Sequence, residues 1–594
     1  MKHSIIRLLG ILLSLVLMLG LMSGMGLTVY AEPTGTGIDG QNNKTNENST
    51  LREESAQTTR PLNAEEQVIL EEEKAKVRAQ YGENRKITDE QYDKSLAVKC
   101  VNGTFVGRKS DGVIAYKGIP FVGKQPVGEY RWKAPVAFEP DDGVYEAYYN
   151  AKSAHQMIDF SETASLYYQG EDCLYLDIWT TGNADTEKKP VIVWIHGGGY
   201  VLGGTVDPLY DCCNFVKENN DVIFVSIPYR LGVFGFLHLS HLPDGADYPD
   251  AQNLGILDQI MALKWIHENI AGFGGDPDRV TVFGESSGGG SASLLPLVPG
   301  SHEYIKRVIA DSGSPCLTRT TEQAIQCTTE LMEELGCKTV ADLQKVSIQD
   351  LLLADFTRLY ARVTPEKDGK WLPLDPYEAY ANGAARDIEI LQGCNKDESN
   401  YYIHACGGVE PAVNILNGVI ARKTAEMTEE EKALIESFRN DVQGEDYDNV
   451  LRFIDHLWYT APLIRLSENQ TKAGGKSYTW LFAVESTVPF MKCGHSIELA
   501  TLLNHPEITG FTGRQFDETF SKTMRRMLVQ FAKTGNPSLT ADISPDGKDH
   551  VWPLYDTENK WLMVFEEFDI HPERESDRKL VDWERTYFLT KYYC

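Results

Sequence analysis

Basic residues are scarce in this 594-residue chain, in which 57 Lys and Arg stand against 86 Asp and Glu, a formal net charge of −29 at pH 7. Nucleic acids and anionic lipid surfaces are bound largely through patches of positive charge. The shortage of such charge excludes both as default partners. It favours a well-solvated protein that acts on small molecules.

The eleven cysteines show no spacing that is typical of a metal site. None of them form a CxxC pair, and Cys212 and Cys213 are adjacent, so the sequence predicts neither a metal nor another cofactor. No cysteine precedes Cys100, which removes the thiol that a bacterial lipoprotein anchor needs. Because eleven is odd, at least one thiol is free or pairs with another chain.

An apolar run near the N-terminus is short for a membrane span, which prefers about 20 residues. Lys2 and Arg7 precede this run, which extends over residues 8–22, and the small-residue pattern of a signal peptidase site ends at Ala31. We therefore predict export, cleavage after Ala31 and no stable membrane association afterwards. The alternative is that the segment is retained as an anchor.

Residues 32–95 are predicted to form a polar linker, because their first half has almost no apolar residues. Asn63 and Glu66 have the spacing of a helix cap and predict one possible helix over 64–80. The chain thus divides into a signal peptide (1–31), this linker (32–95) and one large domain (96–594).

The domain from residue 96 onward alternates short apolar runs with segments of helical periodicity. Residues 255–269 carry apolar side chains at helical spacing, between two strongly apolar runs. This alternation predicts an α/β protein with a buried, mostly parallel sheet that helices cover on both faces. Strands are predicted at 96–101, 104–107, 113–116, 174–179, 191–195, 222–227, 280–283, 307–310, 388–392 and 478–482.

A Gly-x-Ser-x-Gly motif, residues 284–288, directly follows the predicted strand 280–283. A nucleophilic serine must be exposed at a sharp strand-to-helix turn, and flanking glycines allow the backbone to turn so tightly. Small residues follow over 287–293, where a helix has to pack closely. We therefore predict that Ser286 is a nucleophile; the alternative is a structural glycine-rich turn.

A second glycine motif, His196-Gly197-Gly198-Gly199, follows the predicted strand 191–195. Backbone N–H groups of such a loop can approach the oxyanion that forms during acyl transfer. A phosphate cradle is the alternative, but neither a following Lys-Ser/Thr pair nor a GxGxxG continuation supports it.

A serine nucleophile needs a base, which a carboxylate orients. Downstream of Ser286, His495 lies in a loop just after the predicted strand 478–482, and it is the favoured base. The acid is expected after an earlier strand, and both Asp397 and Glu398 follow the predicted strand 388–392. Mechanical reasoning alone does not choose between these two carboxylates.

Ordered motifs over about 500 residues, from about Leu96 to the end, resemble the type B carboxylesterase family, which includes cholinesterases, bile-salt-stimulated lipases and bacterial para-nitrobenzyl esterases. So many motifs at the family's spacing are specific. They are YKGIPF (116–121), EDCLYLDIW (171–179), VWIHGGGY (193–200), PYRLGVFGF (228–236), FGGDPDRVTVFGESSGG (273–289), DSGS (311–314), NKDES (395–399), GHSIEL (494–499) and FAKTGNP (531–537).

The resemblance implies an α/β-hydrolase fold with helical insertions and a serine hydrolase mechanism through an acyl-enzyme. It places the nucleophile at Ser286, the base at His495 and the acid at Glu398, where Ser399 replaces the glycine of the family pattern. Activity should then fall on acidification, from a midpoint near the reference value of ~6.5 displaced by the carboxylate.

The same resemblance assigns the oxyanion donors to the backbones of Gly198, Gly199 and Ser287. Ser287 stands where the family usually has alanine, and its N–H is the same donor. Glu285 and Arg319 fall in the substrate pocket. A guanidinium at Arg319 would favour a carboxylate on the acyl half of the substrate; the alternative is that Arg319 points to solvent.

Two departures from the family pattern narrow the expectations. Thr163 stands where cholinesterases have a tryptophan, so cation–π recognition of a quaternary ammonium is not expected there. The resemblance implies a disulfide at Cys173, but the matching upstream stretch 151–157 has no cysteine. The competing functions are a catalytically inactive binding member of the same fold, and an amidase or thioesterase on the same triad.

Overall fold

The computed structural model describes residues 82–89, 91–156, 168–182, 188–359, 362–424, 427–440 and 446–575. The predicted signal peptide, the possible helix at 64–80 and Thr163 lie outside the described residues. All statements below concern the described part of the chain.

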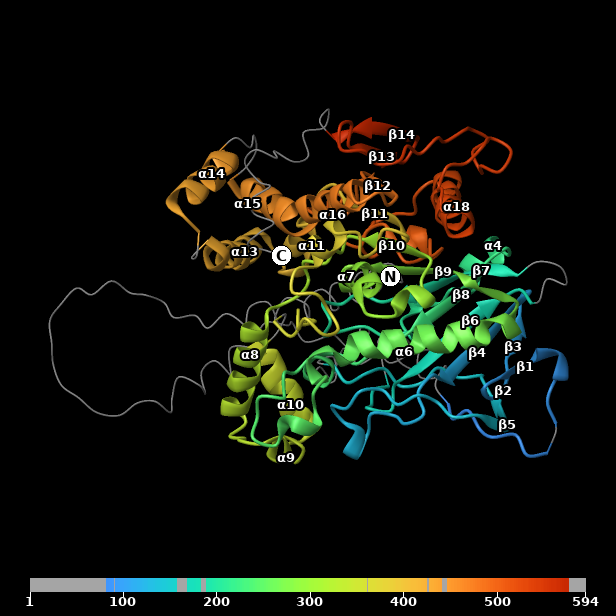
Figure 1. Cartoon of the computed structure of the whole chain (residues 1–594). Helices are drawn as coiled ribbons and strands as arrows, with labels where there is room; N and C mark the ends of the chain where they lie inside the picture. Colours follow the sequence, from blue (N-terminus) through green and yellow to red (C-terminus); the bar gives the residue numbers. More distant parts are fainter. Residues whose placement is uncertain are drawn as a thin grey trace, which may run out of the picture.

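An eleven-stranded sheet forms the centre of the molecule (Figure 1), in the order β14-β13-β12-β11-β10-β9-β7-β8-β6-β4-β3. From β8 to β13 neighbouring strands are parallel, and antiparallel pairs extend the sheet at both edges. The strands are β3 (Arg108–Ser110), β4 (Val113–Pro120), β6 (Tyr175–Thr180), β7 (Lys189–Ile195), β8 (Ile223–Ile227), β9 (Gly275–Glu285), β10 (Arg307–Asp311), β11 (Glu389–Asn395), β12 (Ser477–Phe482), β13 (Trp561–Glu566) and β14 (Asp569–Arg574).

The prediction of a mostly parallel, buried sheet is confirmed, and each predicted strand overlaps an observed one. Every residue of β7, β8 and β10 is buried, as expected for strands that are covered on both faces. The edge strands β3, β13 and β14 were not predicted.

Two hydrophobic cores lie on the two faces of this sheet, because successive side chains of a strand point to opposite faces. Val193 of β7 belongs to the core that contains Leu263 of α6 (Leu254–Asn269). Its neighbour Trp194 belongs to the core that contains Phe531 of α18 (Glu518–Thr534). The helices α6 and α18 therefore cover opposite faces.

A separate three-stranded sheet packs beside the main one, in the order β1-β2-β5. Its strands are β1 (Ala97–Cys100), β2 (Asn102–Val106) and β5 (Asp141–Glu146). Residues 82–89, which fall within the predicted linker, contact this region: the Asn84 side chain donates to Lys117 O at 2.8 Å, and Arg85 pairs with Glu146 at 2.9 Å.

The remaining helices are shorter or belong to insertions between strands (Figure 1). One insertion, α8 to α10, lies between β10 and β11, and another, α13 to α15, lies between β11 and β12. These helices are α4 (Cys213–Glu218), α5 (Gly232–Gly235), α7 (Ser287–Leu294), α8 (Thr321–Glu334), α9 (Val340–Leu343), α10 (Ile348–Ala354), α11 (Pro376–Ala381), α12 (Asn400–Ala405), α13 (Val409–Thr424), α14 (Glu429–Asn440), α15 (Asp446–Asp455), α16 (Ala461–Lys472) and α17 (Leu499–Leu502).

The helical turns, labelled η, complete the list of elements, and two of them, η10 and η11, are π-helical. The turns are η1 (Lys94–Leu96), η2 (Gly128–Tyr130), η4 (Pro208–Tyr210), η5 (Gly245–Asp247), η6 (Ala251–Asn253), η7 (Ile270–Phe273), η8 (Leu295–Leu297), η9 (Ser301–Glu303), η10 (Asp355–Leu359) and η11 (His456–Thr460).

Among the described residues, no helix combines the length and the apolar character that a membrane crossing requires. Nine cysteines in this part of the chain are free thiols, including Cys100 and Cys173, whereas Cys316 is disulfide-bonded. The disulfide that the family resemblance implied at Cys173 is therefore absent.

Candidate active site

Ser286 occupies the sharp turn between β9 and α7, with φ 56° and ψ −124°. A serine rarely adopts a positive φ, and such strain is typical of a nucleophile at the end of a strand. A Cβ on Gly284 would overlap the backbone of Gly288, and a Cβ on Gly288 would overlap the Ile195 carbonyl of β7. Both glycines of the motif are thus required by close backbone packing, as predicted.

The glycine loop after β7 lies directly against this turn. A Cβ on Gly197 would come within 3.1 Å of the Ser286 Cβ. Gly198 and Gly199 have φ values of 105° and 64°, which favour glycine. In the described part of the chain, no backbone acceptor is recorded for the N–H groups of Gly198, Gly199 or Ser287. The three predicted oxyanion donors thus remain available beside Ser286.

The acid and the base meet after two neighbouring parallel strands. Glu398 follows β11 and His495 follows β12, and Glu398 Oε2 lies 2.6 Å from His495 Nδ1. Glu398 is fully buried, and its Oε1 accepts hydrogen bonds from Ser312 Oγ (2.5 Å) and from the Asn395 N–H (2.7 Å). These contacts hold the carboxylate in one orientation toward the imidazole.

Asp397, the competing acid from sequence reasoning, does not contact the histidine. Its Oδ2 is buried without a hydrogen-bond partner among the described residues, and burial raises the pKa of this carboxyl. Ser399 keeps the loop in place because its N–H donates to Asp455 Oδ1 at 2.6 Å. The serine that replaces the family's glycine therefore does not displace Glu398.

Glu285 lies against the other nitrogen of the imidazole, which sequence reasoning did not anticipate. Its Oε1 is 3.2 Å from His495 Nε2 and accepts a hydrogen bond from Ser496 Oγ at 2.6 Å. No hydrogen bond between Ser286 Oγ and His495 is recorded in the described structure. Glu285 thus contacts the base and competes with Ser286 for it, rather than simply lining a substrate pocket.

The two carboxylates change the expected ionisation of the base. Burial alone would lower the pKa of His495, but Glu285 and Glu398 outweigh it and raise the pKa to about 9. Burial raises the pKa of Glu285 in turn. The starting expectation of a value near 6.5 is therefore displaced upward, since the imidazolium is held between two acids.

A second layer of acids lies behind this pair, and sequence reasoning did not assign it a role. Burial and neighbouring carboxylates raise the pKa of Glu498 to about 8 and that of Asp311 well above its ordinary value. The Asn395 side chain donates to Glu498 and to Gly494 O. Both acids belong to motifs read from the sequence, but their burial depends on strands that pair only in the fold.

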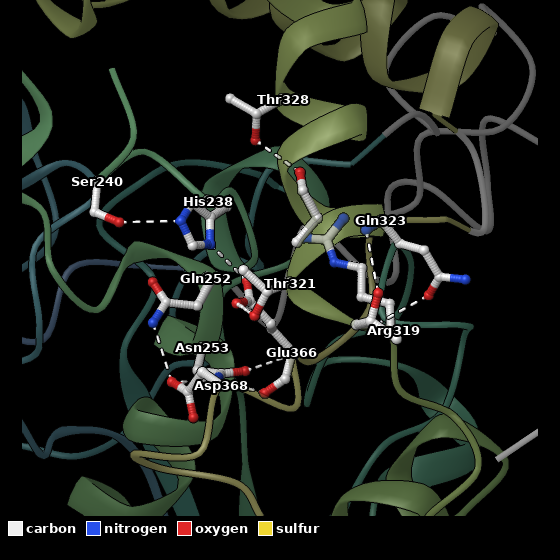
Figure 2. A network of polar contacts seen from close by, with 12 residues as sticks. His238, Ser240, Gln252, Asn253, Arg319, Thr321, Gln323, Thr328, Glu366 and Asp368 are labelled. Carbon is white, nitrogen blue, oxygen red and sulfur yellow. Dashed lines mark hydrogen bonds and ion pairs between the residues drawn. The ribbon is translucent and has the colours of Figure 1, made fainter. Parts of the chain in front are cut away.

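Arg319 is not placed as predicted. Its guanidinium is 4% exposed and donates to the carbonyl oxygens of Phe236 and Arg362, and Glu366 is close by (Figure 2). The alternative of a solvent-facing side chain is also wrong. Because backbone carbonyls hold the guanidinium, it is a structural link between β10 and η10 rather than a free receptor for a carboxylate.

Figure 2 also shows a second hydrogen-bonded Ser-His-Glu chain. Ser240 Oγ lies 3.1 Å from His238 Nε2, and His238 Nδ1 lies 2.8 Å from Glu366 Oε2. Ser240 does not have a positive φ, and its neighbours in the chain are leucine and histidine. The strained turn and the adjoining glycine loop are what distinguish the chain at Ser286.

The described residues contain no group of three or more His, Cys, Asp or Glu that could hold a metal ion. The chemistry available at this site is therefore that of a strained serine, an imidazole between two carboxylates, and three backbone N–H groups. These parts suit nucleophilic acyl transfer.

Comparisons with known proteins agree with this fold and site. The model of the carboxylesterase family matches residues 94–577. The chain is 33% identical over 513 residues to the para-nitrobenzyl esterase of Bacillus subtilis, which covers 80% of this chain and 96% of that protein. It is 28% identical over 528 residues to an acetylcholinesterase of Leptinotarsa decemlineata, covering 79% and 81% respectively.

Solved structures give the same answer. The carboxylesterase of Geobacillus stearothermophilus superposes with a TM-score of 0.71 at 32% identity, covering 83% of this chain and 99% of that one. The fold is therefore that of an α/β hydrolase. The chain belongs to the carboxylesterase family and is a carboxylic ester hydrolase.

Proposed function

We propose that this protein is an exported serine carboxylesterase that hydrolyses small-molecule esters through an acyl-enzyme on Ser286. The observation that carries the proposal is the 2.6 Å contact between Glu398 and His495 beside a strained serine. Geometry of this kind is recognised by the roles of its groups, and each role has a candidate here.

In the proposed mechanism, Ser286 Oγ attacks the ester carbonyl while His495 Nε2 accepts its proton. The N–H groups of Gly198, Gly199 and Ser287 stabilise the negative oxygen of the tetrahedral intermediate. His495 then protonates the leaving alcohol, and an acyl-enzyme remains. Water, activated by the same imidazole, attacks the acyl group and releases the acid and the free serine.

Glu285 imposes a condition on this sequence of steps. His495 accepts a proton from Ser286 only in its neutral form, so a proton must leave the His495–Glu285 pair or move onto Glu285 before attack. Hydrogen bonds to a base often tighten only once the substrate is bound. Substrate binding that turns the imidazole from Glu285 toward Ser286 would complete the triad.

Export is proposed from the N-terminal segment of the sequence. Purified protein from the culture medium should begin after Ala31, as N-terminal sequencing or intact mass would determine. Retention of the whole chain in the membrane fraction would instead support an uncleaved anchor.

The activity is tested with para-nitrophenyl acetate and butyrate on the wild type and on Ser286→Ala. The proposal expects turnover that the substitution abolishes. An inactive wild type would favour a binding protein on the same fold, whereas equal activity of the two proteins would remove Ser286 from the mechanism.

A further inference from the structure

A buried carboxylate lies behind the glycine loop and takes no part in the mechanism above. Asp355 is the first residue of the π-helical turn η10 and is 6% exposed. Its Oδ2 accepts a hydrogen bond from the Val233 N–H at 3.1 Å, whereas its Oδ1 has no partner among the described residues. An unpaired carboxylate oxygen is costly to bury, and π-turns are frequent at functional sites.

Glycine at position 232 makes room for this carboxylate. Gly232 has φ 48°, and a Cβ there would overlap Asp355 Oδ2. The acid therefore lies close against the backbone of α5 and is not a loosely placed surface group.

Asp355 lines a small, largely enclosed cavity of about 10 Å³, which has room for one water-sized group. The other lining residues include His155, whose Nδ1 also lacks a partner among the described residues, and Gln156, whose amide bonds the backbone of Gly203. Two polar atoms without protein partners thus line the same cavity.

The cavity adjoins the oxyanion loop. Val201 and Gly232 line it. The Val201 N–H donates to Gly198 O at 3.1 Å, and the Gly232 N–H donates to Tyr200 O at 2.8 Å. A substrate bound with its carbonyl at Gly198 and Gly199 would have the cavity immediately behind that loop.

The charges around the cavity leave it negative. Arg319, drawn in Figure 2, is near both Glu366 and Asp355, so one positive charge faces two carboxylates. Burial raises the pKa of Asp355 to about 7, and burial lowers the pKa of His155. Above neutral pH these groups therefore leave one uncompensated negative charge.

We propose that Asp355 binds a compact, hydrogen-bonding cation of the substrate, so that esters carrying a primary ammonium group are preferred over their uncharged isosteres. This inference rests on the proposed function. An ammonium group matches a water-sized cavity and donates N–H bonds to Oδ1, with His155 Nδ1 as a second acceptor. A trimethylammonium group is too large and has no N–H, so choline esters gain nothing.

The test compares kcat/KM for pairs of esters that differ only in an ammonium group against a methyl group. Phenyl β-alaninate against phenyl butyrate places the ammonium on the acyl half; 4-(aminomethyl)phenyl butyrate against 4-ethylphenyl butyrate places it on the alcohol half. Butyrylcholine against 3,3-dimethylbutyl butyrate tests the quaternary case. At about pH 8 the amines remain protonated and Asp355 is mostly ionised.

The expected result is a preference of roughly 10-fold or more for the ammonium ester of one of the first two pairs, and none in the choline pair. Asp355→Asn should bring that preference close to unity. Asp350→Asn, on α10, is the matched control because Asp350 is exposed and its loss changes the net charge equally. This control should leave the preference unchanged.

A second measurement needs no variant. The ratio of kcat/KM for the two esters of a pair cancels the titration of His495, which both share. In the wild type this ratio should decrease as the pH falls through about 7, because Asp355 becomes protonated while Arg319 and Glu366 keep their partners.

Equal rates for both esters of the first two pairs in the wild type would overturn the proposal and leave the cavity to a structural water. So would a preference that Asp350→Asn removes as fully as Asp355→Asn. Failure to hydrolyse any ester, including phenyl butyrate, would instead count against the proposed function.

Discussion

The substitution Glu285→Gln should lower the pH at which the enzyme becomes active. His495 must be neutral to accept the Ser286 proton, and its pKa is raised to about 9 from 6.5. Because the pKa is raised, the base form is present only at higher pH, and activity falls as the pH drops through the midpoint. Removing one of the two carboxylates that favour the imidazolium moves the midpoint back toward 6.5.

The magnitude follows from the distances at the site. At an effective dielectric constant of ~20, two unit charges 3.2 Å apart attract by about 5 kcal/mol, which burial of both groups partly offsets. The net shift of His495 corresponds to about 3.4 kcal/mol, shared mainly between Glu285 and Glu398. Loss of Glu285 should therefore lower the midpoint by about one pH unit or more.

The assay is the pH dependence of kcat/KM for an uncharged ester, which reports the ionisation of the free enzyme. Asp397→Asn is the matched control, since it removes a buried acid of the same loop that does not contact His495. Coincident midpoints for wild type and Glu285→Gln would refute the assignment of the raised pKa to Glu285, as would an equal shift in Asp397→Asn.

Four further predictions follow from the same structure. Glu398→Ala should reduce kcat far more than Asp397→Ala, because the Glu398 carboxylate lies 2.6 Å from His495; the reverse order would assign the acid to Asp397. Ser287→Ala should change kcat less than about 10-fold, since the backbone N–H stays and only the weak 3.2 Å contact of Ser287 Oγ with the Tyr200 N–H is lost; a loss near 1,000-fold would show that the hydroxyl acts in catalysis. Gly288→Ala should lower the melting temperature and abolish turnover, because its Cβ would overlap the Ile195 carbonyl; a stable, active variant would contradict the packing at the turn. Arg319→Leu should lower the melting temperature without changing the kcat/KM ratio of a hemisuccinyl ester to its neutral isostere; a selective loss for the charged ester would restore Arg319 as an acyl receptor.

The central strands and the nucleophile turn could be predicted from sequence because each depends on local pattern. Continuous apolar runs such as Val191–Ile195 are unusual except in a buried parallel sheet. The Gly284 to Gly288 turn likewise carries its steric requirement in its own residues. The edge strand β14 has a half-exposed, charged sequence, and its position is fixed by pairing with β13.

The partners of buried charges could not be predicted, because they depend on distances between strands that are far apart in sequence. Glu285 was expected in a substrate pocket, yet its side chain reaches a histidine 210 residues away in the chain. Arg319 was placed by counting along the chain, and the fold gave its guanidinium backbone acceptors. Asp355 carried no sequence signal, since only the packing of η10 against Gly232 buries it.

The central claim is that Ser286 carries the acyl group during ester hydrolysis. The most direct measurement is rapid mixing with para-nitrophenyl acetate, followed by an acid quench and mass analysis of the peptides. The account predicts one acetyl group per chain on the peptide that contains Ser286, and none in Ser286→Ala, whose turnover should fall by about 10,000-fold or more. An acetyl group on another serine, such as Ser240, or steady turnover by Ser286→Ala, would contradict it.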